Sequence, residues 1–223
     1  MNTKKYLNIM YDMDGTLFSS NKILIQAYRN GITELNKHFN ISVRVPELNE
    51  ILQLVGQPSR IIYKTLWPEL NNQQSEFLSP QILKNLCEMI RKGKAEIFPN
   101  VSDTLKTLNE LKFRQFIVSN GGGPYLNSII DYYNFNRIFE KLSTLSSTGA
   151  KSKSELLKNI IESEKINKNE TIMVGDRIQD YEAAKNNNID FIGVDWGHGN
   201  NEEIKNANYI ISSFEKIIDI LTY

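Results

Sequence analysis

Apolar and polar positions alternate along this chain with two different periods. Short apolar runs such as RQFIVSN, TIMVGD and DFIGVDW are typical of buried strands. Between them lie segments such as SKSELLKNIIESEKI, whose apolar residues recur at the spacing of one helix face. Strands that alternate with helices predict a parallel sheet that is covered by helices on both faces. We therefore expect an α/β fold with a doubly wound parallel sheet.

One stretch, residues 19–94, breaks this alternation because it contains helical patterns without clear strands between them. Within it, FSSNKILIQAYRNGITELNKHF predicts a long helix. SPQILKNLCEMIRKG predicts another helix, which begins at Ser79 and has Pro80 in its first turn. The pattern predicts that the sheet core, residues 1–18 and 95–223, is interrupted after its first strand by an all-α insertion, residues 19–94.

The bulk properties exclude several classes of partner. The 223 residues include 26 Lys+Arg and 26 Asp+Glu, so the formal net charge is zero. With no basic surplus and no apolar run of membrane-spanning length, we expect neither a nucleic-acid nor a membrane partner. Cys87 is the only cysteine, so it cannot form an internal disulfide, and the start MNTKKYLNIM is a poor signal peptide. These two features predict a cytoplasmic location.

Polar residues gather where three predicted strands end, and two lysines precede a predicted helix. They are Asp12 and Asp14, Ser119 and Asn120, Asp176 and Asp180, and the lysines Lys151 and Lys153. Ligands of doubly wound sheets bind at the carboxyl ends of the strands, so we expect these side chains to meet there. Three carboxylates close together need a cation, and their hard oxygens suit Mg²⁺. A hydroxyl, an amide, a helix start and a lysine suit a phosphate group.

The first two carboxylates carry the most specific signal. Leu7, Ile9 and Tyr11 alternate as on a strand and lead directly into Asp12 and Asp14. An Asx turn at the end of a strand needs only one carboxylate. The second carboxylate adds repulsion that a cation or a proton must relieve, so the pair indicates chemistry rather than a turn.

Three motifs in this order resemble those of the haloacid dehalogenase superfamily. They are DMDGT, FIVSN and VGDRIQD, and together they span most of the chain. The inserted helices, with LFSSNKILIQAYRNGI and VGQPSRIIYKTLWPEL, resemble the cap of the phosphoglycolate-phosphatase-like members. The family's lysine motif is the least regular, because KSKSE lacks both prolines of the common KPxP form. Lys151 and Lys153 both stay open as the phosphate lysine, with a slight preference for Lys153.

The resemblance implies a Rossmann-like core, a helical cap and a Mg²⁺-dependent phosphatase that acts on small phosphomonoesters. In such an enzyme Asp12 forms an aspartyl-phosphate, and Asp14 exchanges protons with the leaving group and with water. The implied ligands of Mg²⁺ are Asp12, the Asp14 carbonyl and Asp176. Asp180 would bind the ion through water or orient the lysine.

The same resemblance implies a set of substrate-binding residues. They are Gly15, Thr16, Ser119, Asn120 and Arg60. Gly15 permits a sharp turn and a close approach of its N–H to phosphate, and Arg60 would touch an anionic leaving group. We also expect repulsion from Asp12 to keep Asp14 protonated, as acid catalysis requires.

The sequence leaves several alternatives to a small-molecule phosphatase open. A nucleotidase, a pyrophosphatase or a sugar-phosphate mutase would use the same core residues. A non-catalytic binding relative would retain the fold without turnover. For a phosphatase the expected partner is a small phosphorylated metabolite, and the expected assembly is a monomer or a homodimer.

Overall fold

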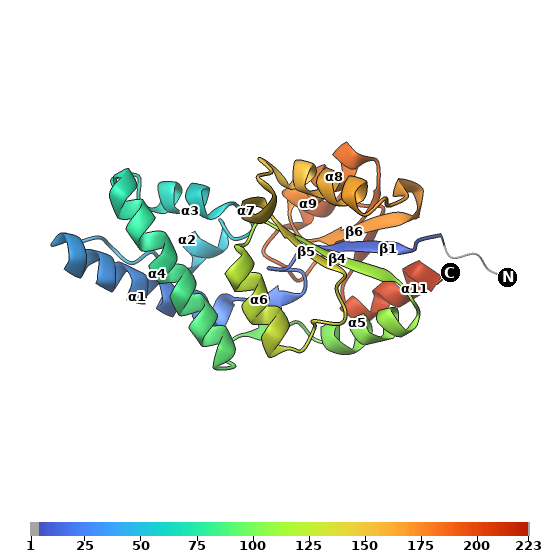
Figure 1. Cartoon of the computed structure of the whole chain (residues 1–223), viewed down its shortest axis with the longest axis horizontal. Helices are drawn as coiled ribbons and strands as arrows, with labels where there is room; N and C mark the ends of the chain where they lie inside the picture. The colour runs from blue at the N-terminus through green and yellow to red at the C-terminus, as the bar shows by residue number, and fades with distance from the viewer. Residues whose placement is uncertain (1–4, 223) are drawn as a thin grey trace.

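The chain forms a six-stranded parallel sheet with helices on both sides (Figure 1), in a computed structural model that describes residues 5–222. The sheet order is β5-β4-β1-β6-β7-β8, and each neighbouring pair is parallel. The strands are β1 (Asn8–Tyr11), β4 (Arg114–Ser119), β5 (Lys141–Thr144), β6 (Thr171–Gly175), β7 (Asp190–Val194) and β8 (Tyr209–Ile211). This architecture confirms the predicted doubly wound α/β class. Residues 1–4 and 223 of the predicted core, with the start of MNTKKYLNIM, lie outside the described residues.

The first strand lies at the centre of the sheet, where it pairs with β4 on one side and β6 on the other. All four of its residues are buried, whereas Leu7, which precedes it, is 40% exposed. The alternation over Leu7, Ile9 and Tyr11 therefore does not divide a buried face from a solvated one. The reason is that helices cover both faces of a central parallel strand, so Met10 is as buried as Ile9.

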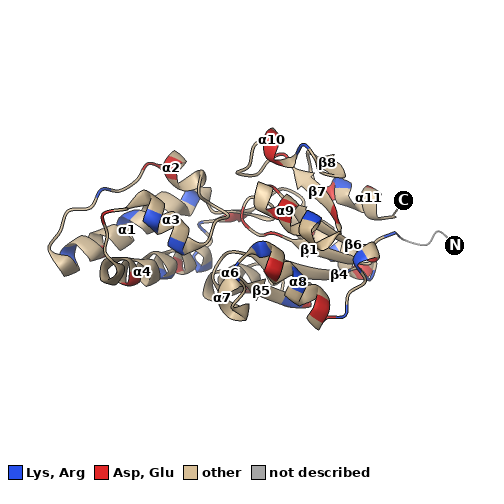
Figure 2. Cartoon of the chain, turned by 90° about the horizontal axis from the view of Figure 1, so that it is seen from above, with Lys and Arg blue, Asp and Glu red and all other residues tan. Residues whose placement is uncertain are grey.

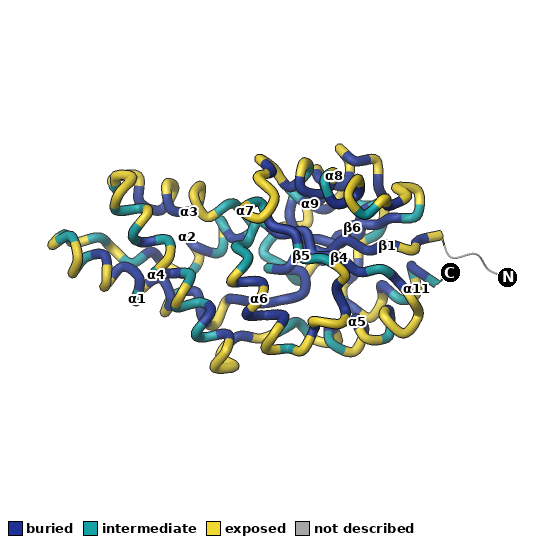
Figure 3. Tube along the Cα trace, viewed as in Figure 1, coloured by how far each residue is buried: buried dark blue, intermediate teal, exposed yellow. Residues whose placement is uncertain are grey.

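Two groups of helices cover the two faces of the sheet. One face carries α5 (Val101–Glu110), α6 (Gly123–Tyr132) and α11 (Ile217–Thr222), and the other carries α8 (Lys153–Ser163) and α9 (Ile178–Asn187). Each face has its own apolar cluster, so the strands lie between two layers of core (Figure 3). Short connecting helices complete this part: α7 (Leu145–Thr148), η1 (Lys168–Glu170), α10 (Asn201–Ile204) and η2 (Phe214–Lys216).

Four helices form a second body beside the sheet (Figure 1), which we call the cap. They are α1 (Asn21–Phe39), α2 (Leu48–Leu52), α3 (Ser59–Leu66) and α4 (Asn72–Arg91). The cap has its own apolar cluster, in which Trp67 stacks on Tyr28. The chain enters and leaves it through two short antiparallel strands, β2 (Phe18–Ser19) and β3 (Glu96–Ile97). The division at residues 18/19 and 94/95 stays a prediction, and these paired strands support it.

The fourth cap helix begins earlier than the sequence predicts. Asn71 caps it, accepting a hydrogen bond from the Gln74 N–H at 2.9 Å, while the Gln74 side chain accepts one from the Asn71 N–H. The predicted start at Ser79 is wrong, and Pro80 lies inside the helix. The capping pair at its start satisfies free backbone groups, and apolar contacts on both sides of the proline keep the helix continuous.

The elements that the sequence did not predict are all short. β5 has four residues at the edge of the sheet, and β2 and β3 have two residues each. Such segments are too short to display a period, so only pairing with a neighbouring strand defines them.

Charged residues of both signs are mixed over the cap and the sheet body (Figure 2). Among residues 5–222, no helix combines the length and the apolar character that crossing a lipid bilayer requires.

The contact between α1 and α4 depends on the missing side chain of Gly31. A Cβ atom built there would overlap Ile82 of the facing helix. We predict that Gly31→Leu lowers the free energy of unfolding by about 1–3 kcal/mol, because the added side chain would force α1 and α4 apart. Urea denaturation measures the change. Lys37→Leu, at an exposed position of the same helix, is the control and should stay within about 0.5 kcal/mol. Equal effects of the two substitutions would contradict this packing.

Candidate active site

The candidate site lies at the carboxyl ends of the three central strands. Asp12 follows β1, Ser119 ends β4 and Asp176 follows β6. Chain connections run to opposite sides of β1, which opens a crevice at this edge of a doubly wound sheet. The polar residues that the sequence predicted at three strand ends therefore come together in space.

Lys153 is the centre of this group. It is the first residue of α8, whose start is fixed by Ser152 accepting a hydrogen bond from the Glu155 N–H. Its Nζ atom donates to Asp12 Oδ1 at 2.8 Å and to Asp180 Oδ1 at 2.6 Å, and only 5% of the residue is exposed. Burial lowers the lysine pKa, but the charges of both carboxylates outweigh it and raise the pKa above its usual value. Lys153 therefore stays protonated.

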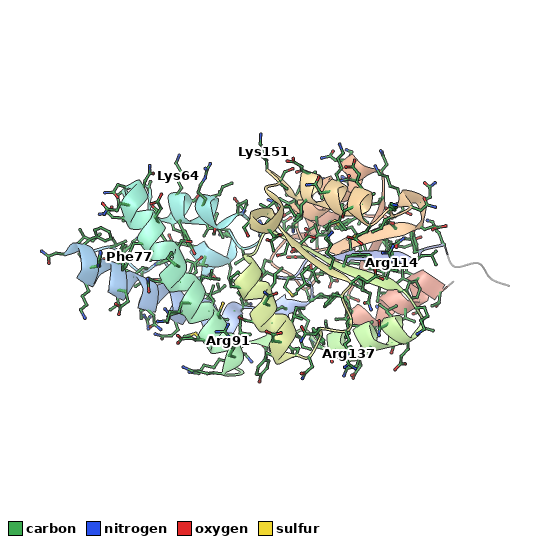
Figure 4. All side chains as sticks on the ribbon, in the orientation of Figure 1. Lys64, Phe77, Arg91, Arg114, Arg137 and Lys151 are labelled. Atoms are coloured by element: carbon green, nitrogen blue, oxygen red, sulfur yellow. The ribbon has the colours of Figure 1, made fainter. Side chains whose placement is uncertain are left out.

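Lys151, the other lysine of the same loop, is not part of this group. It is exposed, and Figure 4 shows its side chain pointing away from the body of the protein. Its backbone N–H donates to Glu155 Oε2 at 2.9 Å. The structure therefore favours Lys153 over Lys151. The physical reason is that the first residue of α8 is directed at the strand ends, whereas Lys151 precedes the cap of this helix.

Asp176 is held from three directions. Its Oδ1 atom accepts from the Thr16 hydroxyl at 3.1 Å, and its Oδ2 atom accepts from the backbone N–H groups of His198 at 2.7 Å and Gly199 at 3.2 Å. Burial and the charge of Asp180 raise the pKa of Asp176 to about 7, although these hydrogen bonds lower it. The carboxylate is fixed in orientation and still lacks compensating charge.

Gly15 and Thr16 serve this carboxylate and do not line the cavity above the site. A Cβ atom on Gly15 would overlap the Asp176 carboxylate, and its φ of +87° is in the left-handed region. The Gly15 N–H donates to the Phe18 carbonyl at 2.9 Å, so the predicted contact of this N–H with phosphate is corrected. Thr16 is fully buried against Asp176, so its predicted contact with substrate is corrected too.

Both carboxylate oxygens of Asp180 already have donors. Oδ1 accepts from Lys153, and Oδ2 accepts from the backbone N–H groups of Asp176 at 3.1 Å and Arg177 at 3.0 Å. Of the two roles predicted for Asp180, orientation of the lysine is the one that this geometry favours. Direct binding of a metal ion would break one of these bonds.

The residues present fit a divalent cation. Asp12, Asp176 and Asp180 each offer an oxygen within 4.8 Å of the others, and Asp12 Oδ2 is buried without a hydrogen-bond partner. Burial raises the pKa of Asp12 well above its usual value, and Lys153 offsets this only in part. When all three carboxylates are ionised, the single ammonium of Lys153 leaves two negative charges uncompensated, which a hard divalent ion such as Mg²⁺ would balance.

Asp14 lies apart from this charge cluster, on the side of the cavity. Its Oδ1 atom accepts from the Tyr125 hydroxyl at 2.6 Å. Burial raises the pKa of Asp14 to about 6, while hydrogen bonds from Tyr125 and Ser20 lower it. The expectation that repulsion from Asp12 raises this pKa is corrected: desolvation is the cause, because Lys153 compensates the Asp12 charge.

The end of β4 and the glycines after it form one wall of the site. The Ser119 hydroxyl oxygen accepts from the Gly121 N–H at 3.0 Å, which tightens the turn into α6. The Asn120 amide donates to the carbonyl of Gly56 in the cap at 2.7 Å, and its Oδ1 atom is buried without a partner. Part of the Asn120 side chain, which the sequence assigned to phosphate, therefore holds the cap.

A cavity of about 150 Å³ lies between the strand ends and the cap. Its floor includes Asp12, Asp14 and Ser119, and its roof includes the loop around Gly56. Arg177 fixes this loop to the core. Its guanidinium donates to the carbonyl of Val55 at 3.2 Å and to that of Gln53 at 3.3 Å, and it is paired with Glu203. The cap loop is thus closed over the carboxylates.

Arg60 does not line this cavity. It is exposed and lies in an adjoining groove on the outer side of the cap, with Lys64 and Glu76. The prediction that Arg60 touches the leaving group is therefore corrected. The stretch that contains it does reach the site, through Gly56, Gln57 and Ser59. The turn into α3 directs the next side chain outward.

Two residues of the site escaped the sequence reasoning. Tyr125 follows the three glycines, and nothing in PYLNSIIDYY distinguishes it from a core tyrosine. Arg177 lies inside VGDRIQD, at a position where that motif allows any residue. Their contacts with Asp14 and with the cap loop come from segments far apart in the sequence, which no local pattern reveals.

Comparison with known proteins identifies the family. The profile of the family described as "Haloacid dehalogenase-like hydrolase" matches residues 9–194, which is most of the chain. The chain belongs to this family. The match includes all three motifs on which the resemblance was based, and it confirms that resemblance.

Similar haloacid dehalogenase-like proteins carry different names. The phosphoglycolate phosphatase of Psychrobacter arcticus is 25% identical over 223 residues, covering 96% of this chain and 94% of that protein. The 5'-nucleotidase of Pseudomonas aeruginosa is 21% identical over 210 residues, covering 90% of this chain and 88% of that protein. The solved structure of a predicted phosphoglycolate phosphatase from Haemophilus somnus has a TM-score of 0.85 at 17% identity, covering 98% of this chain and 99% of that one. The fold is shared, and the names do not agree on a substrate.

Lys151, before α8, and Lys153, its first residue, provide a direct test of the charge cluster. We predict that Lys153→Met lowers the free energy of unfolding by about 3–5 kcal/mol, because it leaves buried carboxylates without their cation. Lys151→Met, at the exposed position, should change it by less than about 0.5 kcal/mol. Urea unfolding in the presence of chelator measures both. A similar loss in the two variants would contradict the assignment of Lys153 to the cluster.

Proposed function

We propose that this protein is a Mg²⁺-dependent phosphatase that hydrolyses small phosphomonoesters through a phosphorylated Asp12. The observation that carries the proposal is the state of that side chain. Asp12 lies on the floor of the cavity, Lys153 holds its Oδ1 atom, and its Oδ2 atom has no partner. The relatives named phosphoglycolate phosphatase and 5'-nucleotidase support a phosphomonoesterase.

In the first step an Asp12 oxygen attacks phosphorus in line with the ester oxygen. The new bond joins Asp12 to phosphorus, and the bond between phosphorus and the leaving oxygen breaks. Protonated Asp14 gives its proton to that oxygen, so the leaving group departs as an alcohol. A carboxyl group whose pKa is about 6 is suited to this exchange near neutral pH.

In the second step water attacks the phosphorus of the aspartyl-phosphate. Asp14, now ionised, takes a proton from the water, and the bond between Asp12 and phosphorus breaks to release inorganic phosphate. The hydrogen bond from Tyr125 keeps the Asp14 carboxylate directed at the cavity during both steps. Asp12 and Asp14 then return to their starting states.

The phosphoryl group would be held between the carboxylates and the start of α6. Ser119, Gly121 and Gly122 line the cavity on that side, and the free N–H groups at a helix N-terminus favour an anion. The positive charge of Lys153 favours the ionised form of Asp12, which is the form that attacks phosphorus. Asp12, the Asp14 carbonyl and Asp176 would hold Mg²⁺, which supplies charge that offsets the repulsion between nucleophile and phosphate.

The nucleophile assignment predicts a loss of turnover in a folded protein. Asp12→Asn should lower kcat for p-nitrophenyl phosphate at least about 1000-fold, because an amide cannot form the phosphorylated intermediate. Phosphate release measures activity, and thermal unfolding verifies the fold. The matched control Asp103→Asn, at an exposed site in α5, should retain normal turnover. A near-normal kcat in Asp12→Asn would contradict the mechanism.

Metal dependence is measured in the same assay. Removal of divalent ions with chelator should abolish phosphate release by the unmodified protein, and excess Mg²⁺ should restore it, because the buried negative charge is otherwise uncompensated. Undiminished release in chelator would contradict the metal part of the proposal.

A further inference from the structure

The cavity above Asp12 has an unusual distribution of charge. Its only charged lining residues are Asp12 and Asp14, and among residues 5–222 no lysine, arginine or histidine lines it. In the proposed phosphatase, the floor of the cavity and the start of α6 bind the phosphoryl group. The leaving group must therefore lie against the remaining walls, which the cap provides.

Those cap walls consist of apolar and uncharged polar side chains. The cap residues that line the cavity are Ser20, Leu24, Tyr28, Val55, Gly56, Gln57, Ser59, Ile62, Tyr63, Ser79, Leu83 and Leu86. Tyr28 and Tyr63 are mostly buried, and their rings pack edge to face. Walls of this kind accept a carbon skeleton and can exchange hydrogen bonds with a hydroxyl group, but they offer no positive charge to balance an anion.

The lysine and arginine side chains that lie nearest in the sequence or the fold do not line the cavity. Lys153 is bound between two carboxylates below the cavity. Arg177 is paired with Glu203 and donates to two cap carbonyls. Arg60 and Lys64 line the outer groove, which shares Ser59, Tyr63 and Ser79 with the cavity, but neither of the two lines the cavity itself; Figure 4 shows Lys64 at the outer edge of the cap. With the cap closed as observed, none of them is available to the leaving group.

We propose that the leaving group of the substrate is an uncharged alcohol, and that the cap selects against carboxylate- and phosphate-bearing leaving groups. This inference rests on the proposed phosphatase function and adds the class of substrate to it. A carboxylate in this cavity would lose its hydration, gain no cationic partner and lie beside Asp12 and Asp14. Such an unpaired buried charge lowers kcat/KM by about 100-fold or more.

A matched pair of substrates tests this selectivity. 2-Phosphoglycolate and 2-hydroxyethyl phosphate have the same two-carbon skeleton. The first carries a carboxylate where the second carries a hydroxymethyl group. With the full chain and Mg²⁺, kcat/KM for phosphate release should be about 100-fold higher, or more, for 2-hydroxyethyl phosphate. Equal values, or a preference for 2-phosphoglycolate, would overturn the inference and leave the phosphatase function intact. Release from neither ester, nor from p-nitrophenyl phosphate, would instead contradict the proposed function.

A cation introduced into the cap wall supplies the reverse test. Gln57 lines this cavity and does not line the outer groove. Gln57→Lys should shift the ratio of kcat/KM values at least about 10-fold toward 2-phosphoglycolate, and Gln57→Met, of similar length without charge, should leave the ratio unchanged. An equal shift of this ratio in both variants would contradict the inference that the charge of the cap wall determines the selectivity. If Gln57→Lys does not fold, the substrate pair with the unmodified protein still decides.

Discussion

The buried ammonium of Lys153 is the contact on which the rest of this site depends. It joins the end of β1, through Asp12, to the start of α9, through Asp180. Asp180 in turn accepts from the backbone that follows β6, so one network fixes three strand and helix ends. Carboxylates this close would otherwise repel one another or become protonated. Lys153 favours their ionised form, and the negative charge that it does not balance provides the basis for a divalent ion.

The cap completes the site in a different way, because its contribution is shape rather than charge. Arg177 and Asn120 both bind backbone carbonyls of the loop around Gly56, so core residues determine how close the cap lies. Backbone contacts of this kind leave the cap side chains free to line the cavity. In the proposed phosphatase, the core acts on the phosphoryl group, which phosphoesters share, and the uncharged cap wall contacts the leaving group, which differs between substrates.

The sequence predicts the sheet core and its three polar strand ends well, because strong periods and compact motifs mark them. It could not choose between Lys151 and Lys153, since both precede the same helix and only burial separates them. It also assigned Thr16 to the substrate, although that hydroxyl binds Asp176. Long-range contacts decide such cases. Pro80 misled the prediction of the cap helix because a helix-start signal and a tolerated interior proline look alike locally.

Trapping the aspartyl-phosphate would show whether Asp12 carries the phosphoryl group. Asp14→Asn removes the group that accepts a proton from water, so hydrolysis of the aspartyl-phosphate should be slow in this variant. Formation of the aspartyl-phosphate should be less affected when the leaving group, such as p-nitrophenolate, needs no proton. The variant would be incubated with p-nitrophenyl phosphate and Mg²⁺, quenched in acid and digested for mass spectrometry. We expect one added phosphoryl group on the peptide that contains Asp12, and none when Asp12→Asn is also present. A phosphoryl group on any other residue would contradict it.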